Sequence, residues 1–124
     1  MSRDRYGIVW TMRLTSRDTV QPFETKDGSI VRELMHAANQ SLAEATLAPG
    51  QPTQRHYHAA SEELYSILEG GGLFEIDGES REVGPGDTVL IPPGARHRLT
   101  AGPSGARFLC CCAPPYSHDD TFFD

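Results

Sequence analysis

The sequence of 124 residues predicts an all-β domain folded as one small closed barrel. Two observations lead to this prediction. First, no stretch of about 12 or more residues repeats apolar side chains at the i, i+3, i+4, i+7 spacing of an amphipathic helix. Second, short alternating or β-branched runs recur at a spacing of roughly 8–12 residues, which is typical of antiparallel sandwiches and barrels. Closing the sheet would also remove strand edges that invite aggregation.

Turn residues divide the chain into the expected strands. Asp77-Gly78 has the composition of a two-residue hairpin turn with positive φ. The clusters at 84–87 and 92–94 are rich in Gly and Pro, which central strands do not tolerate. The predicted strands are Ser29–Met35, Ser41–Leu47, Gln54–His58, Glu63–Leu68, Gly72–Ile76, Glu79–Val83, Thr88–Ile91, His97–Ala101 and Ala106–Cys112.

The length allows one domain with appendages at both ends. We expect the barrel to occupy residues 23–112. Residues 1–22 are mostly polar with isolated apolar side chains, and we interpret them as an N-terminal arm. Residues 113–124 contain Pro114-Pro115 and a polar stretch, and we expect them to lie over the surface as a tail.

Composition and charge exclude several classes of function. A net charge of −6 with scattered basic residues argues against nucleic-acid binding. No apolar run approaches the roughly 20 residues that span a membrane, and no apolar segment of a secretory signal follows the N-terminus. The three cysteines are consecutive, Cys110-Cys111-Cys112, which does not suit a disulfide framework. We therefore expect a cytoplasmic protein in a reducing compartment.

One constellation of residues carries chemistry. His56 and His58 are two residues apart in a predicted strand, so both side chains point to the same face. Glu63 opens the next predicted strand after a short turn, and His97 begins a later one. The spacing of the histidine pair and the carboxylate favours a shared cation.

The frame around these residues resembles the two sequence motifs of the cupin superfamily. The first motif runs from Gly50 through the two histidines and Glu63 to Gly70, and the second runs from Gly86 through Pro92 and Gly94 to His97. Nine specified positions at roughly 5% usage each coincide by chance on the order of once in 10¹² frames.

The resemblance implies a double-stranded β-helix, the jelly-roll barrel of cupins, with a metal inside it. It implies His56, His58, Glu63 and His97 as the ligands. The second motif usually ends in Asn, where this chain has Ala101. That Asn is not a ligand in the family pattern, so the implied ligand set is unaffected.

Three imidazoles and one carboxylate suit Fe, Mn, Ni, Co, Cu or Zn as divalent ions. Four protein ligands leave coordination positions open, as in catalytic sites. With one carboxylate, the site carries a formal charge of about +1, which favours an anionic or chelating oxygen ligand.

Strand alternation places further residues around the expected site. If Glu63 points inward, Tyr65 and Ile67 do so as well, and Leu99 follows His97. Tyr65 and Glu62 are the nearest candidates for a general base. The cysteines are ambiguous, since either Cys111 or the pair Cys110 and Cys112 faces the cavity.

Three functions remain open at this point. The first is a metal-dependent dioxygenase acting on a small chelating substrate. The second is a redox-neutral isomerase, epimerase or lyase that uses the metal as a Lewis acid. The third is a non-enzymatic protein that binds a small molecule. We expect a small-molecule ligand and no nucleic-acid or membrane partner. The family resemblance also implies a homodimer, with residues 1–22 available for exchange.

Overall fold

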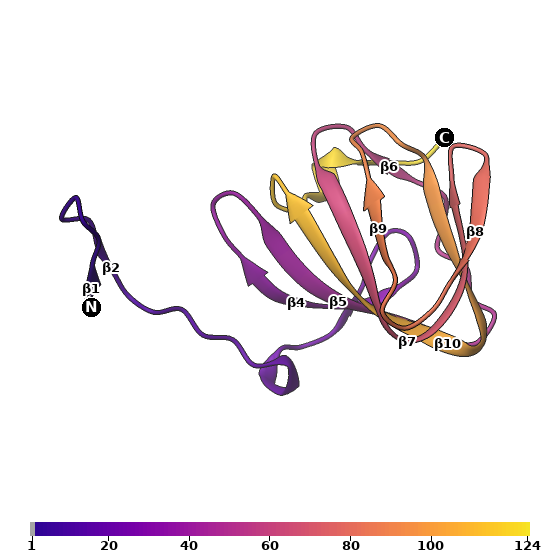
Figure 1. Cartoon of the computed structure of the whole chain (residues 1–124), viewed down its shortest axis with the longest axis horizontal. Coiled ribbons are helices and arrows are strands. Elements are labelled where there is room, and N and C mark those ends of the chain that lie inside the picture. Colours follow the sequence, from indigo (N-terminus) through magenta and orange to yellow (C-terminus); the bar gives the residue numbers. More distant parts are fainter. Residues whose placement is uncertain (1) are drawn as a thin grey trace.

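The computed structural model describes residues 2–124, and nearly all of its regular structure is β (Figure 1). The seven-stranded main sheet has the order β3-β4-β5-β10-β7-β8, with β9 also paired to β7. Two small sheets, β1-β2 and β11-β6, accompany it. The strands are β1 (Ser2–Arg3), β2 (Val9–Trp10), β3 (Phe23–Glu24), β4 (Ile30–His36), β5 (Ser41–Leu47), β6 (Tyr57–His58), β7 (Glu62–Ile76), β8 (Glu79–Val83), β9 (Thr88–Ile91), β10 (His97–Ala113) and β11 (Thr121–Phe122). Two 3₁₀ turns, η1 (Arg17–Thr19) and η2 (His118–Asp120), are the helical elements among the described residues.

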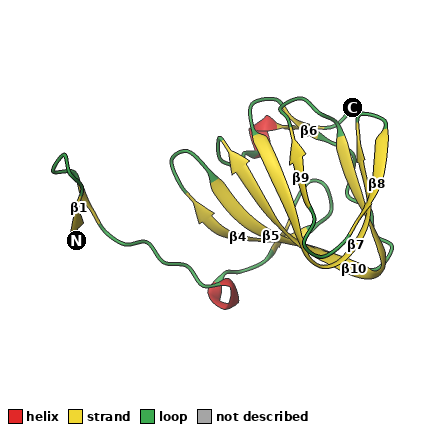
Figure 2. Cartoon of the chain, viewed as in Figure 1, coloured by secondary structure: helices red, strands yellow, loops and turns green. Residues whose placement is uncertain are grey.

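Two long strands form the frame of the barrel. β7 and β10 pair along their length as antiparallel neighbours and bend sharply (Figure 2). The first half of β7 also pairs with β9 and its second half with β8, while the second half of β10 pairs with β5. Because the bent pair contributes to both sides, the sheet curls around one interior. The prediction of an all-β barrel is confirmed.

The bend lies within two continuous strands, where the sequence predicted four separate ones. Runs 63–68 and 72–76 belong to β7, and runs 97–101 and 106–112 belong to β10. Gly70 has a φ of +69°, and a Cβ there would lie 2.0 Å from the carbonyl oxygen of Gly105. The glycine therefore permits close approach of two backbones inside a continuous strand pair and does not end the strand. The turn at Asp77-Gly78 has the expected positive φ at both residues, 43° and 86°.

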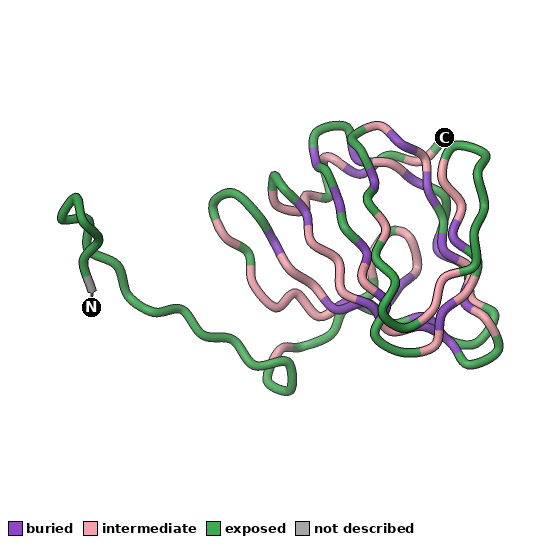
Figure 3. The backbone as a smooth tube through the Cα atoms, in the orientation of Figure 1, coloured by how far each residue is buried: buried purple, intermediate pink, exposed green. Residues whose placement is uncertain are grey.

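The core lies between the curled halves of the sheet, and burial alternates along the strands (Figure 3). Leu47, Ile67, Phe74, Leu99 and Phe108 are almost completely buried. Ile67 follows Glu63 by four residues and Leu99 follows His97 by two, so within each half-strand the core and the candidate site share the interior face.

The two ends of the chain behave differently. The N-terminal arm extends away from the barrel in Figure 1, and six large apolar side chains of its described part are exposed. These are Tyr6, Ile8, Val9, Trp10, Met12 and Leu14. The C-terminal segment instead returns to the barrel, where β11 pairs with β6. Within residues 2–124, no helix is long and apolar enough to cross a membrane.

Candidate metal centre

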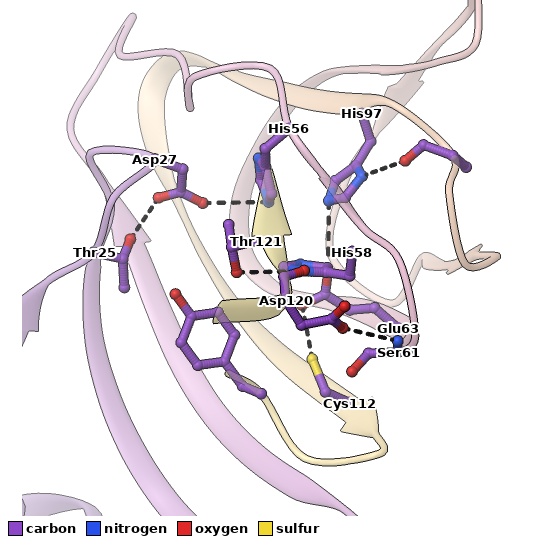
Figure 4. A network of polar contacts seen from close by, with 12 residues as sticks. Thr25, Asp27, His56, His58, Ser61, Glu63, His97, Cys112, Asp120 and Thr121 are labelled. Carbon is purple, nitrogen blue, oxygen red and sulfur yellow. Dashed lines mark hydrogen bonds and ion pairs between the residues drawn. The ribbon is translucent and has the colours of Figure 1, made fainter. Parts of the chain in front are cut away.

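Four side chains converge at one end of the barrel interior (Figure 4). His58 ends β6, and His56 forms an isolated antiparallel bridge with His97 at the start of β10. The alternation of the chain turns Tyr57 away from the two histidines. Glu63 enters from β7, and one ligand atom of each residue lies within 4.8 Å of the others. The structure thus brings together all four predicted ligands, and His97 lies beside His56 on a paired strand.

Backbone carbonyls orient the imidazoles of His56 and His97. Nδ1 of His56 lies 2.8 Å from the carbonyl oxygen of Gln54, and Nδ1 of His97 lies 2.9 Å from that of Ala95. A carbonyl oxygen only accepts hydrogen bonds, so each Nδ1 carries the proton and donates it. The lone pair is then left on Nε2, which is the arrangement found in metal-binding histidines.

Two buried atoms at the centre lack hydrogen-bond partners. Oε1 of Glu63 and Nε2 of His97 are inaccessible to solvent and unsatisfied. The Oε1 atom lies 3.3 Å from Nε2 of His58 and 3.5 Å from Nε2 of His97. Buried polar atoms without partners are costly, and a cation between these lone pairs would satisfy them. The residues therefore fit a divalent transition metal, while their N₃O donor set is shared by several metals.

Electrostatics keep Glu63 in its anionic form. Burial alone would raise its pKa, but the close imidazoles of His58 and His97 outweigh burial and lower the pKa to about 2. Burial and the neighbouring His97 lower the pKa of His56, which favours its neutral form. Burial also acts to lower the pKa of His58, but the adjacent Glu63 carboxylate raises it.

A thiol holds the other carboxylate oxygen. Sγ of Cys112 donates to Oε2 of Glu63 over 3.3 Å. Burial and the adjacent carboxylate raise the pKa of Cys112, so the thiol keeps the proton that it donates. Cys110 lines the same cavity as Cys112, whereas Cys111 is not among the residues that line it. Cys110 and Cys112 are therefore the cysteines that face the cavity.

The C-terminal segment supplies a second support that sequence reasoning missed. Nδ1 of His58 lies 3.3 Å from the carbonyl oxygen of Asp120 and 3.3 Å from Oγ1 of Thr121. The Asp120 carboxylate also accepts from the backbone N–H groups of Ala59, Ala60 and Ser61. It thereby holds the turn between two ligand-bearing strands. No local sequence signal marks this role, because the contacts span about 60 residues of chain.

Asp27 is a second residue that sequence reasoning missed. It lies in the turn between β3 and β4, and its side chain is 13% exposed. Its Oδ2 atom lies 3.7 Å from Nε2 of His56. Its Oδ1 atom accepts from Oγ1 of Thr25 and from both N–H and Oγ of Ser29. Thr25-Lys26-Asp27-Gly28-Ser29 is a turn sequence in the chain, but nothing in it indicates that the turn faces the metal ligands.

The two predicted base candidates are placed differently. Tyr65 is buried, lines the cavity and packs against the rings of Phe108 and His97. Burial and the charge of Glu63 raise the pKa of Tyr65 well above its ordinary value, so its phenol remains protonated. Glu62 is exposed on the opposite face of β7 and does not line the cavity. The structure therefore does not bring Glu62 to the four ligands.

A cavity opens beside the ligands. Its enclosed volume is about 50 Å³, which is smaller than most small-molecule sites and suits only a very small ligand. His56, His58 and Glu63 form its polar end, and apolar side chains such as Ala45 and Phe108 form its walls. A small organic molecule entering from the mouth would reach the open side of the ligand cluster.

Fold and cluster together define a class of protein, a small jelly-roll barrel with a three-histidine, one-glutamate centre. The cupin-domain sequence model matches residues 43–112, which include all four residues of the cluster. Over 119 residues, the chain is 48% identical to the uncharacterized protein MJ1618 of Methanocaldococcus jannaschii, covering 90% of this chain and 95% of that protein. The chain belongs to the cupin family.

More distant relatives match parts of the chain or its fold. Dimethylsulfoniopropionate lyase DddW of Ruegeria pomeroyi is 40% identical over 67 residues, which are 54% of this chain and 43% of the lyase. The solved structure of Pac13 from Streptomyces, described as a nucleoside dehydratase, superposes with a TM-score of 0.77. That likeness covers 90% of both chains at 18% identity and therefore concerns the fold alone.

Proposed function

We propose that this chain is a metal-dependent enzyme that catalyses a redox-neutral reaction of the lyase or isomerase type on a small organic substrate. The observation that carries the proposal is the Asp27 carboxylate, which lines the cavity with Oδ2 3.7 Å from the ligand atom of His56. Such reactions need a group that removes a proton beside the activated carbonyl. Sequence reasoning offered only Tyr65 and Glu62 for this task.

Each residue has a defined part in this proposal. His56, His58, Glu63 and His97 would hold a divalent cation, which supplies Lewis acidity toward a substrate oxygen when it is bound. Asp27 would accept the substrate proton at Oδ2, because Oδ1 is already occupied by Thr25 and Ser29. The protonated phenol of Tyr65 acts as a wall and not as a base.

The partial match to DddW supports the same reaction class. Its name describes a lyase, and 40% identity over 67 residues is local evidence of relationship. The matched part is less than half of that protein, so the match supports the reaction class and does not identify the substrate.

The location that we propose is the cytoplasm. Three free thiols among the described residues are consistent with such a reducing environment.

A dioxygenase is the second candidate, and one observation favours it. The three-histidine, one-glutamate cluster faces a largely apolar cavity, and four protein ligands would leave coordination positions free for a chelating substrate and dioxygen. This alternative makes no use of the Asp27 carboxylate, which is why we rank it second.

Hydrogen–deuterium exchange distinguishes the two candidates. Protein purified without chelators or metal-affinity resin is analysed for metal and then incubated in D₂O under nitrogen with a panel of small hydroxycarbonyl compounds. We expect metal-dependent incorporation of deuterium beside the carbonyl, slowed about 100-fold or more by Asp27→Asn. Exchange at the wild-type rate in the variant would refute the role of Asp27. Substrate turnover that stops under nitrogen and resumes with oxygen would favour the dioxygenase.

A further inference from the structure

The side chains that line the cavity carry an unusual balance of charge. Asp27, Glu33 and Glu63 line it, and among the described residues no lysine or arginine does. Glu63 and Asp27 together would offset the two positive charges of a bound divalent cation, so that the metal centre would be neutral. The sequence alone indicated a charge of about +1 because only one carboxylate was known to be near. That earlier expectation of an anionic ligand does not fit the cavity as it is built.

The carboxylate of Asp27 is held by hydrogen bonds at only one of its two oxygens. Oδ1 of Asp27 accepts hydrogen bonds of 2.6 Å from Oγ1 of Thr25, 2.6 Å from Oγ of Ser29 and 2.9 Å from the backbone N–H of Ser29. Oδ2 has no hydrogen-bond donor among the described residues and lies beside His56. A carboxylate oxygen only accepts, so its complement is an O–H or N–H group on the ligand.

The remaining walls carry no positive charge. Val31, Ala43, Ala45 and Phe108 are apolar, and the hydroxyl groups of residues such as Ser41, Tyr65 and Tyr116 are uncharged. A second negative charge on a ligand would therefore meet no cation except the metal, while lying close to Asp27 in a partly desolvated site. Like charges at such short range repel strongly where water is largely excluded.

From this charge balance, we infer that the cavity selects an uncharged small molecule bearing a hydroxyl group. That hydroxyl donates a hydrogen bond to Oδ2 of Asp27. The inference rests on the proposed metal centre and names the substrate class of that site. Dianionic chelators such as oxalate are disfavoured. Hydroxycarbonyl compounds are favoured, because the carbonyl oxygen faces the metal ligands while the adjacent hydroxyl faces Asp27.

Opposite changes in the affinities of two probes test the inference. Binding of hydroxyacetone and of oxalate to metal-loaded protein is measured by calorimetry for the wild type, Asp27→Asn and Glu24→Gln. Asp27→Asn should strengthen oxalate binding about tenfold and weaken hydroxyacetone binding several-fold, because a repelling charge and a strong acceptor are both lost. Glu24→Gln removes an equal charge from an exposed position on β3 and should change neither.

A wild-type measurement guards against a variant that does not fold. Methoxyacetone has the same carbonyl group but no hydroxyl proton, and should bind about tenfold more weakly than hydroxyacetone. Equal affinities for the two ketones, or weaker oxalate binding in Asp27→Asn, would overturn the inference. Purified protein that neither contains nor takes up a divalent metal would overturn the proposed function as well, which distinguishes the two failures.

Discussion

His56 and His97 lie directly opposite one another on an isolated antiparallel bridge, with their ring centroids 4.2 Å apart. Both bridge hydrogen bonds are formed, with N–O distances of 3.1 Å and 2.9 Å. The pair therefore belongs to the backbone framework of the barrel, and its convergence does not depend on mobile side chains. This relationship explains how residues 41 positions apart in sequence form one site.

His97→Ala should abolish tight metal binding. The variant loses one of four ligands and leaves the Glu63 carboxylate buried with less compensation, so we expect metal affinity to fall about 100-fold or more. Competition with a chromophoric chelator measures this directly. His36→Ala is the matched control, because His36 is exposed on β4 outside the cluster. Equal losses in both variants would contradict the assignment of His97.

Asp120→Ala should weaken metal binding although Asp120 is not a ligand. The carboxylate accepts from the N–H groups of the 59–61 turn, at 2.9–3.2 Å, and its loss frees the segment that carries His58. Supporting residues of this kind typically change metal affinity by about 10–100-fold. Asp119→Ala removes a neighbouring exposed carboxylate and should have no effect. An unchanged metal affinity in Asp120→Ala would mean that the tail is dispensable for the site.

Cys112 should act through its hydrogen bond to Glu63. Cys112→Ala removes the donor, and we expect metal affinity to fall about tenfold, while Cys112→Ser retains a donor and most of the affinity. Titration of each variant with Zn²⁺ or Mn²⁺ provides the comparison. Cys111→Ala, on the other face of β10, controls for loss of a thiol. A serine variant as weak as the alanine variant would indicate a packing role for Cys112.

Glu44 should contribute to stability independently of the metal. Its buried carboxylate contacts Arg17 of the arm at 3.0 Å and Arg107 of β10 at 3.1 Å. Glu44→Gln removes the buried charge that both guanidinium groups share, although Arg17 keeps Asp18 and Arg107 keeps Glu69 as partners. We expect a loss of about 1–3 kcal/mol in the free energy of unfolding. Urea denaturation of the metal-free protein measures it. Glu82→Gln, on exposed β8, should change the free energy by no more than about 0.5 kcal/mol.

The N-terminal arm should hold two copies of the chain together. Six large apolar side chains between Tyr6 and Leu14 are exposed in the single chain, more than an isolated soluble arm normally presents. We expect a homodimer, and deletion of residues 2–16 should convert it to a monomer while Arg17 and its contact with Glu44 remain. Light scattering of both proteins is the measurement. A monomeric full-length chain would disprove this prediction.

Much of the fold was predictable because it depends on local signals. Strands β5, β8 and β9 begin and end at the predicted residues, since Gly, Pro and Asp turns bound them. The continuity of β7 and β10 was not predictable, because the glycines at 70–72 look like a strand end. Only the approach of Gly105 to Gly70 reveals a bend within a long strand pair.

The barrel was predictable from the sequence because strand alternation and turn residues are local signals. The spacing of His56, His58 and Glu63 is local as well, whereas His97 entered the predicted ligand set through the resemblance to cupins. Only the tertiary structure decided what surrounds them. Asp27, Cys112 and Asp120 reach the cluster from the β3–β4 turn, from β10 and from the tail, through pairings of strands far apart in the chain. Those long-range contacts set the charge of the cavity. Because of that charge, we now expect an uncharged hydroxyl compound as the ligand in place of an anion.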